Sequence, residues 1–167
     1  MTVTNGLPTA GIAGRQPFAL SWAPPGTFHH VGFVVASIED SIRSFAETIG
    51  GEWDGEITRD PIQSVRVAFL RGRSLSDPLI ELVEPDGDDS PVARFLKRGG
   101  GLHHVCYETD DLDRQLDESR AKGGLITSAP QPAVAFGGRR IAWVYTKQKL
   151  LIEYLEAVSP QLSAFNS

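Results

Sequence analysis

The sequence has little that would cross-link the chain or carry it into a membrane. Its single cysteine, Cys106, permits no intramolecular disulfide, which is typical of a reducing compartment. No apolar run approaches the ~18 residues of a transmembrane helix, and the first residues lack the basic and apolar segments of a signal peptide. Acidic residues outnumber basic ones, 21 to 16, which argues against nucleic acid as a partner. We therefore expect a cytoplasmic protein with neither a nucleic-acid nor a membrane partner.

The composition is that of a folded protein: 41% of the 167 residues are hydrophobic and 22% are charged. Residues 1–26 are rich in Thr, Gly, Pro and Ala and lack apolar periodicity, so we expect a flexible N-terminal tail. The alternation of Phe18, Leu20 and Trp22 leaves open a short strand packed on the body or on a second subunit. We expect the folded domain to span residues 27–157 and a C-terminal tail to span 158–167.

An internal repeat organises this domain. The segment 29–33 (His-His-Val-Gly-Phe) recurs at 103–107 (His-His-Val-Cys-Tyr), 74 residues later. The same offset relates Val-Ala-Phe at 67–69 to Ile-Ala-Trp at 141–143. Leu-Ile-Glu recurs at an offset of 72, which one loop shorter by two residues explains. Blocks in near-constant register indicate a duplication.

Each copy predicts a βαβββ unit, so the expected fold class is α+β with two tandem βαβββ modules. The first module covers about 27–85 and the second about 101–157, and a short helix at about 90–98 links them. Ser37 is placed to cap the first helix, and the glycines at 50–51 are placed to end it. The expected strands are 28–35, 52–58, 64–70, 78–84, 102–109, 125–128, 140–145 and 150–156, and the expected main helices are 38–49 and 112–122.

Four polar residues interrupt the apolar strands at equivalent positions of the two copies: His30, Glu81, His104 and Glu153. Strand alternation places each of them on the face opposite the helix-packing residues. Buried carboxylates need compensation, and two imidazoles with two carboxylates suit one divalent cation: Co, Mn, Ni, Fe or Zn. The alternative is an exposed sheet face with solvated glutamates and ordinary strand histidines.

These segments resemble the vicinal oxygen chelate (glyoxalase/bleomycin resistance) superfamily over residues 27–157. Within it the chain is most similar to the methylmalonyl-CoA epimerase family, above all through Ser-Pro-Val-Ala-Arg-Phe-Leu at 90–96 and Gly-Leu-His-His-Val at 101–105. The resemblance implies a U-shaped, partly closed mixed sheet that encloses the metal. It also implies an isomerase that moves the α-proton of an acyl thioester, and a homodimer.

Carried over residue by residue, the resemblance assigns metal ligation to His30, Glu81, His104 and Glu153, and Glu153 is also the expected catalytic base. Val67 stands where some relatives have a second acidic residue, and the loop 145–149 is shorter than theirs. The identity of the acyl carrier therefore stays open. Three further residues are candidates for substrate binding: Gln63, Arg140 and Lys147.

Two other functions share the same scaffold. A glyoxalase-I-like lyase would use the same four ligands but is not supported by the segment 90–96. A non-catalytic small-molecule-binding protein is also compatible with the fold, although it has no need of a complete ligand set.

Overall fold

Two central strands, one from each half of the chain, pair with each other and so join the two halves into one sheet. The computed structural model describes residues 26–74 and 76–158, so nearly all of the two predicted tails lies outside the described residues. The first half contains β1 (Thr27–Val34), α1 (Ile38–Ile49), β2 (Glu52–Trp53), β3 (Thr58–Asp60), β4 (Val65–Arg71) and β5 (Leu79–Pro85). After α2 (Ala93–Leu96), the second half contains β6 (Gly101–Thr109), α3 (Leu112–Ala121), β7 (Leu125–Pro132), the 3-10 helix η1 (Val134–Phe136), β8 (Arg140–Tyr145) and β9 (Leu151–Glu156).

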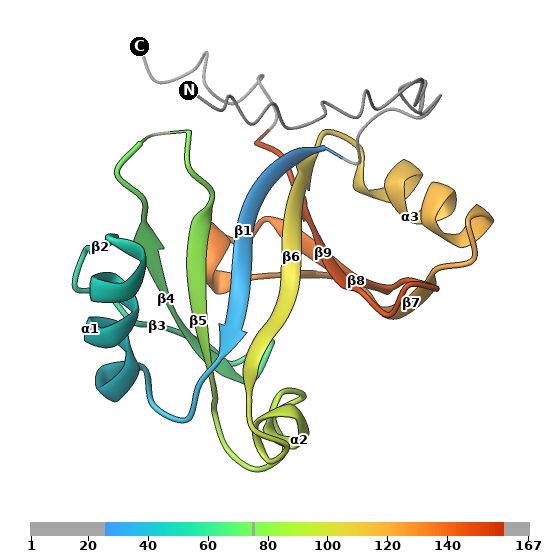
Figure 1. Ribbon diagram of the computed structural model, residues 1–167. Coiled ribbons are helices and arrows are strands. Elements are labelled where there is room, and N and C mark those ends of the chain that lie inside the picture. Colours follow the sequence, from blue (N-terminus) through green and yellow to red (C-terminus); the bar gives the residue numbers. More distant parts are fainter. Residues whose placement is uncertain (1–25, 75, 159–167) are drawn as a thin grey trace, which may run out of the picture.

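All the strands join one mixed sheet in the order β2-β4-β5-β1-β6-β9-β8-β7, with β3 paired to β4. The central pair β1–β6 is antiparallel, whereas β1–β5 and β6–β9 are parallel. In Figure 1 the strands β7 and β8 cross the direction of β4 and β5, so the sheet curves strongly, and α1 and α3 lie on its outer side. The predicted α+β fold of two tandem modules is confirmed.

The helix ends follow the signals in the sequence. The Ser37 side chain accepts a hydrogen bond from the backbone N–H of Asp40 at 3.1 Å and caps α1. Gly50 ends α1 in the left-handed conformation, with φ at 70°. Asp111 caps α3 in the same way, because its carboxylate accepts from the N–H of Arg114.

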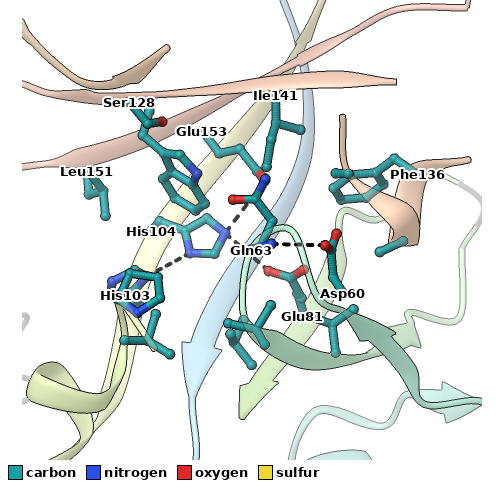
Figure 2. Close-up of a pocket in the computed structure, with 18 of the residues that line it drawn as sticks. Asp60, Gln63, Glu81, His103, His104, Ser128, Phe136, Ile141, Leu151 and Glu153 are labelled. Carbon is teal, nitrogen blue, oxygen red and sulfur yellow. Dashed lines mark hydrogen bonds and ion pairs between the residues drawn. The ribbon is translucent and has the colours of Figure 1, made fainter. Parts of the chain in front are cut away.

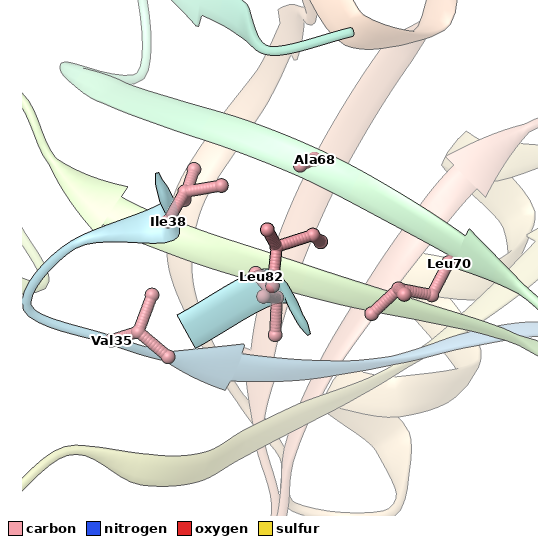
Figure 3. Close-up of a cluster of buried hydrophobic side chains, with 6 residues drawn as sticks. Val35, Ile38, Ala68, Leu70 and Leu82 are labelled. Carbon is pink, nitrogen blue, oxygen red and sulfur yellow. The ribbon is translucent and has the colours of Figure 1, made fainter. Parts of the chain in front are cut away.

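Apolar residues of α1 fill the space between this helix and the outer side of β4 and β5. Ile38 is fully buried and Leu82 lies beneath it (Figure 3). The cluster consists of Val35, Ile38, Ile42, Ala68, Leu70 and Leu82. This core occupies the outer side of the sheet, and a second apolar cluster that includes Val67 and Val83 lies on the inner side.

Three elements differ from the sequence prediction. The strand expected at 52–58 is split into β2 and β3, because the Asp54 carboxylate accepts from the N–H of Glu56 and turns the chain. The strand expected at 125–128 continues to Pro132. The linking helix is regular only over Ala93–Leu96. Across the described residues, every helix is too short or too polar to cross a membrane.

Candidate functional site

Four buried side chains from four adjacent strands meet on the inner side of the sheet. His30 comes from β1, Glu81 from β5, His104 from β6 and Glu153 from β9. The Nε2 atoms of the two histidines lie 3.0 Å apart. Glu81 Oε2 lies 3.4 Å from His30 Nε2 and 3.2 Å from His104 Nε2. Glu153 Oε2 lies 3.1 Å and 3.7 Å from the same two nitrogens, so the four groups converge on one point.

Strand register produces this convergence. On the antiparallel pair β1–β6, Gly32 lies opposite His104 and His30 lies opposite Cys106. On the flanking parallel pairs, Gly32 is in register with Glu81 and Cys106 with Glu153. Each histidine therefore lies next to one carboxylate from its own module and one from the other module.

Gly32 and Cys106 occupy equivalent positions in the two modules but have different structural roles. A Cβ atom at Gly32 would overlap the imidazole ring of His104, so only glycine leaves room for this side chain. At the equivalent place in β6 the Cys106 side chain is fully buried. Burial, followed by the nearby charge of Glu153, raises the pKa of the Cys106 thiol. Cys106 thus stays protonated when no cation is bound.

The charges at the site call for a positive partner. Burial alone would lower the pKa of His30, but the carboxylates of Glu81 and Glu153 outweigh it and raise the pKa to about 10. Burial would likewise raise the pKa of Glu81, yet the two imidazoles lower it well below its usual range. A proton on His30 therefore compensates part of the buried negative charge when no cation is bound.

The donor set fits a divalent cation. Glu153 Oε2 is buried and has no aligned hydrogen-bond donor, which is costly unless another positive group contacts it. Two imidazole nitrogens and two carboxylate oxygens form a ligand set of intermediate hardness, which suits Mn, Fe, Co, Ni or Zn. His30, Glu81 and His104 bring their ligand atoms within 4.8 Å of one another. The described residues thus satisfy the requirements of the predicted site.

A second histidine supports each of these imidazoles. His29 Nδ1 lies 2.9 Å from His30 Nδ1, and His103 Nδ1 lies 3.1 Å from His104 Nδ1. Burial lowers the pKa of His103 to about 4, so its ring is neutral near pH 7 and can accept a hydrogen bond. Because the Nε2 atoms face the convergence point, the Nδ1–H groups of His30 and His104 are free to donate to these neighbours.

The convergence point opens into a cavity of about 320 Å³ between the two modules. In Figure 2 the Glu81, His104 and Glu153 side chains lie close together, with Asp60 and Gln63 on the side of the first module and Phe136 beyond them. The walls are mainly apolar and include Val67, Val83, Ile141 and Trp143. A cavity of this size with a few polar groups is typical of a small-molecule site.

The three candidate substrate-binding residues lie in different places. Gln63 lines the cavity, and its amide Nε2 lies 3.4 Å from the carbonyl oxygen of Pro132. Arg140 does not line it: its guanidinium binds Glu156 at 2.6 Å and Asp113 at 3.2 Å. Strand alternation explains this, because Ile141 faces the cavity and its neighbour must face the other side.

Lys147 also lies away from the site. It lines a second cavity of about 600 Å³ beneath α3, on the other face of the sheet, together with Tyr107 and Tyr154. The turn between β8 and β9 carries Lys147 toward this outer face. Of the three substrate-binding candidates, the structure brings only Gln63 to the site.

Sequence reasoning missed three residues that shape the site: Gly32, Asp60 and Phe136. A glycine inside an apolar strand signals close approach of another group, and this signal was present at Gly32. Asp60 precedes a proline, a combination typical of turns. Phe136 carried no local signal, since its role depends on how the modules face each other.

The fold and the four converging side chains define a known class of proteins. A sequence model of the glyoxalase/bleomycin resistance protein/dioxygenase superfamily matches residues 29–143, and the chain belongs to this superfamily. Its curated relatives include methylmalonyl-CoA epimerases. The chain is 30% identical over 124 residues to the ethylmalonyl-CoA/methylmalonyl-CoA epimerase of Cereibacter sphaeroides, over 73% of this chain and 90% of that protein. It is 38% identical over 114 residues to the mitochondrial methylmalonyl-CoA epimerase of Bos taurus, over 67% and 63%.

Solved structures agree with this relationship. Methylmalonyl-CoA epimerase from Mycobacterium tuberculosis superposes with a TM-score of 0.70 at 25% identity, over 86% of this chain and 97% of that one. A variant of the Streptomyces coelicolor enzyme in complex with 2-nitronate-propionyl-CoA gives a TM-score of 0.68 at 26% identity, over 80% and 99%. The expected family and fold class are confirmed, and the roles of individual residues stay predictions.

Proposed function

We propose that this protein is a metal-dependent epimerase that moves the α-proton of a 2-substituted acyl thioester such as methylmalonyl-CoA. One observation carries the proposal: His30, Glu81, His104 and Glu153, two from each module, converge at a cavity of about 320 Å³. This volume accommodates a small branched acyl group. The curated relatives named above act on substrates of this kind.

In this proposal the four side chains hold one divalent cation. When bound, the cation supplies a Lewis acid that polarises the thioester carbonyl and stabilises the charge that develops on its oxygen. The identity of the cation, Co, Mn, Ni, Fe or Zn, is a matter for metal analysis of the purified protein. His29 and His103 keep the two ligand imidazoles in the orientation that exposes Nε2.

Glu153 carries the proton in the proposed reaction. Its Oε2 atom is buried at the convergence point and would hold the cation, so the other oxygen of the same carboxylate would take the α-proton and return it. The apolar walls formed by Val67, Ile141 and Trp143 exclude water around the reacting carbon. At the position of β4 where some relatives have a second acidic residue, this chain has Val67. A valine side chain cannot carry a proton, so this position supplies no second base.

Proton exchange at the α-carbon tests the proposal. The protein is stripped with chelator, reloaded with Co²⁺ or Mn²⁺, and incubated with methylmalonyl-CoA in D₂O. We expect the methyl doublet in the proton NMR spectrum to collapse to a singlet only with the metal-loaded protein. Glu153→Gln should slow exchange at least about a hundredfold, the usual contribution of a positioned base.

Glu118→Gln is the matched control, because it makes the same chemical change on the exposed side of α3, where Glu118 pairs with Arg114. This variant should exchange at the wild-type rate. Absence of exchange with the metal-loaded wild-type protein, for every acyl-CoA tried, would contradict the proposal.

Two alternatives give different results in the same assays. Isomerisation of the methylglyoxal–glutathione adduct without acyl-CoA exchange would indicate a glyoxalase-I-like lyase, and plant lactoylglutathione lyases are also relatives, matched over 39% of their length. Binding of acyl-CoA without either reaction would indicate a binding protein. The homodimer and the cytoplasmic location are parts of the same proposal, and light scattering and cell fractionation test them.

A further inference from the structure

Asp60 is a buried carboxylate that belongs to neither the core nor the four converging groups. It ends β3, is 2% exposed and lines the cavity. Its Oδ1 accepts hydrogen bonds from the N–H groups of Ile62 at 2.9 Å and Gln63 at 3.0 Å. Its Oδ2 accepts from the N–H of Val134 at 2.7 Å. Within the described residues Asp60 has no ion pair, so three backbone N–H groups stabilise its charge.

One carboxylate therefore connects the two modules. Oδ1 shapes the turn 60–63 of the first module, whereas Oδ2 binds the first residue of η1 in the second. Asp60 and Val134 are 74 residues apart, as are His30 and His104. The pair thus occupies equivalent positions of the repeat and bridges the modules at the cavity wall, as the two histidines bridge them at the convergence point.

The 3-10 helix η1 carries an aromatic wall of the cavity. The Phe136 ring stacks on the His30 imidazole with centroids 5.8 Å apart and planes 20° apart. It also meets the His29 ring edge-on at 5.5 Å and packs against Phe69 at 5.6 Å. Arg139 fixes the far end of η1, because its Nε donates to the Phe136 carbonyl and its Nη1 pairs with Glu108 at 2.6 Å.

We infer that Asp60 is a positioning residue: through the N–H of Val134 it anchors η1 to the first module and so holds Phe136 against His30, which fixes the width of the substrate cavity. The anchor acts on the cavity wall and not on the reacting atoms. The effect of this anchor on substrate binding rests on the proposed function. The role of Asp60 in holding η1 to the first module does not.

Two variants remove the bridging hydrogen bond from opposite sides. Asp60→Asn keeps the shape of the side chain but has one acceptor oxygen, which cannot serve both the turn and Val134. Val134→Pro removes the N–H donor and leaves Asp60 intact. Proline suits the first position of a helix, and the extended backbone of Ala133, with φ −119° and ψ 126°, suits a residue before proline. Asp54→Asn is the matched control, because Asp54 also caps a turn, with Glu56, and among the described residues its carboxylate has no hydrogen bond to η1.

Hydrogen exchange measures the anchor without reference to catalysis. In Asp60→Asn the amides of segment 133–138 should exchange about tenfold or more faster than in the wild type, as expected for loss of a hydrogen bond to a charged acceptor. Asp54→Asn should leave this segment unchanged. Unchanged exchange of 133–138 in Asp60→Asn would overturn the inference, whatever reaction the protein catalyses.

Kinetics measure the consequence for substrate. With metal-loaded protein, Asp60→Asn and Val134→Pro should each raise KM for methylmalonyl-CoA by about three- to tenfold and change kcat much less. The double variant should be no worse than either single one, because both remove the same hydrogen bond. Additive effects, or a loss confined to kcat, would overturn the role in substrate fit. If Asp60→Asn fails to fold, Val134→Pro alone carries both measurements.

Discussion

At the scale of single residues, the site depends on the size of the side chain at two equivalent strand positions, 32 and 106. Gly32 provides the space for the His104 ring, and Cys106, its counterpart, fills the space opposite His30. The sequence predicted the faces of His30 and His104 because strand alternation fixes them. It did not predict the role of Gly32, since the clash partner comes from the other module.

Gly32→Ala should weaken cobalt binding by about 10–100-fold, the range typical of changes that disturb ligand orientation. The added methyl group overlaps the His104 imidazole and forces it away from His30. Titration with Co²⁺, followed by visible absorbance or calorimetry, measures the change. Cys106→Ala, the equivalent site in the second module, is the control and should retain cobalt affinity; wild-type affinity in Gly32→Ala would contradict the steric argument.

The Cys106 thiol should resist alkylation. It is fully buried, and burial raises its pKa, so both access and thiolate are lacking in the folded protein. We expect iodoacetamide to label native protein at least about a hundredfold more slowly than urea-unfolded protein. Because the chain has one cysteine, the mass shift is unambiguous. Rapid labelling of native protein would mean that the β1–β6 pair opens readily.

At the scale of elements, the two helices pack differently on equivalent strands. Phe45 of α1 packs edge-to-face on Phe33, with centroids 5.2 Å apart. At an offset of 74, α3 has Ser119, whose hydroxyl donates to the carbonyl of Gln115 at 2.8 Å. The absence of a large apolar side chain there accompanies the cavity of about 600 Å³ beneath α3.

Phe45→Ala should therefore lower the free energy of unfolding by about 2–4 kcal/mol, because it leaves a void under α1. Ser119→Ala should cost about 1 kcal/mol or less, since it removes one hydrogen bond in a place already loosely packed. Urea unfolding followed by circular dichroism compares the two variants. Equal losses would show that α1 and α3 contribute equally to the core.

The repeat also explains which elements were predictable. Strands that have an equivalent in the other copy of the repeat, as β4 has in β8, could be predicted from apolar alternation in both copies. The split between β2 and β3 depends on one turn at Asp54, and η1 spans three residues, too short for any periodicity. Local hydrogen bonds decide such elements, and strand or helix patterns do not report them.

At the scale of the whole molecule, the four site residues belong equally to both modules, so a bound cation links the two halves. Under saturating conditions, at about a hundred times its Kd, Co²⁺ or Mn²⁺ should raise the free energy of unfolding by about 2.7 kcal/mol. For a chain of this size, this corresponds to a Tm increase of about 5–11 °C. Calorimetry with and without chelator measures it, and one transition should move as a whole.

Glu153→Gln serves as the comparison, because loss of one carboxylate should reduce the increase in Tm at the same metal concentration. Two separate transitions, of which only one moves, would contradict a site shared between the modules.

The overall architecture was predictable because the same pattern occurs in both copies of the repeat, so the interpretation of each copy supports that of the other. The mutual orientation of the modules was not, because the contacts between β3 and η1 leave no periodic trace.

The room that Gly32 makes for a ring of the opposite half also bears on the ancestry of the chain. A hybrid assembled from two second halves would set a cysteine side chain where the His104 ring now lies, and the ring would have to move. The halves are therefore not interchangeable at this position: two first halves would carry glycine at both equivalent places, whereas two second halves would carry cysteine at both.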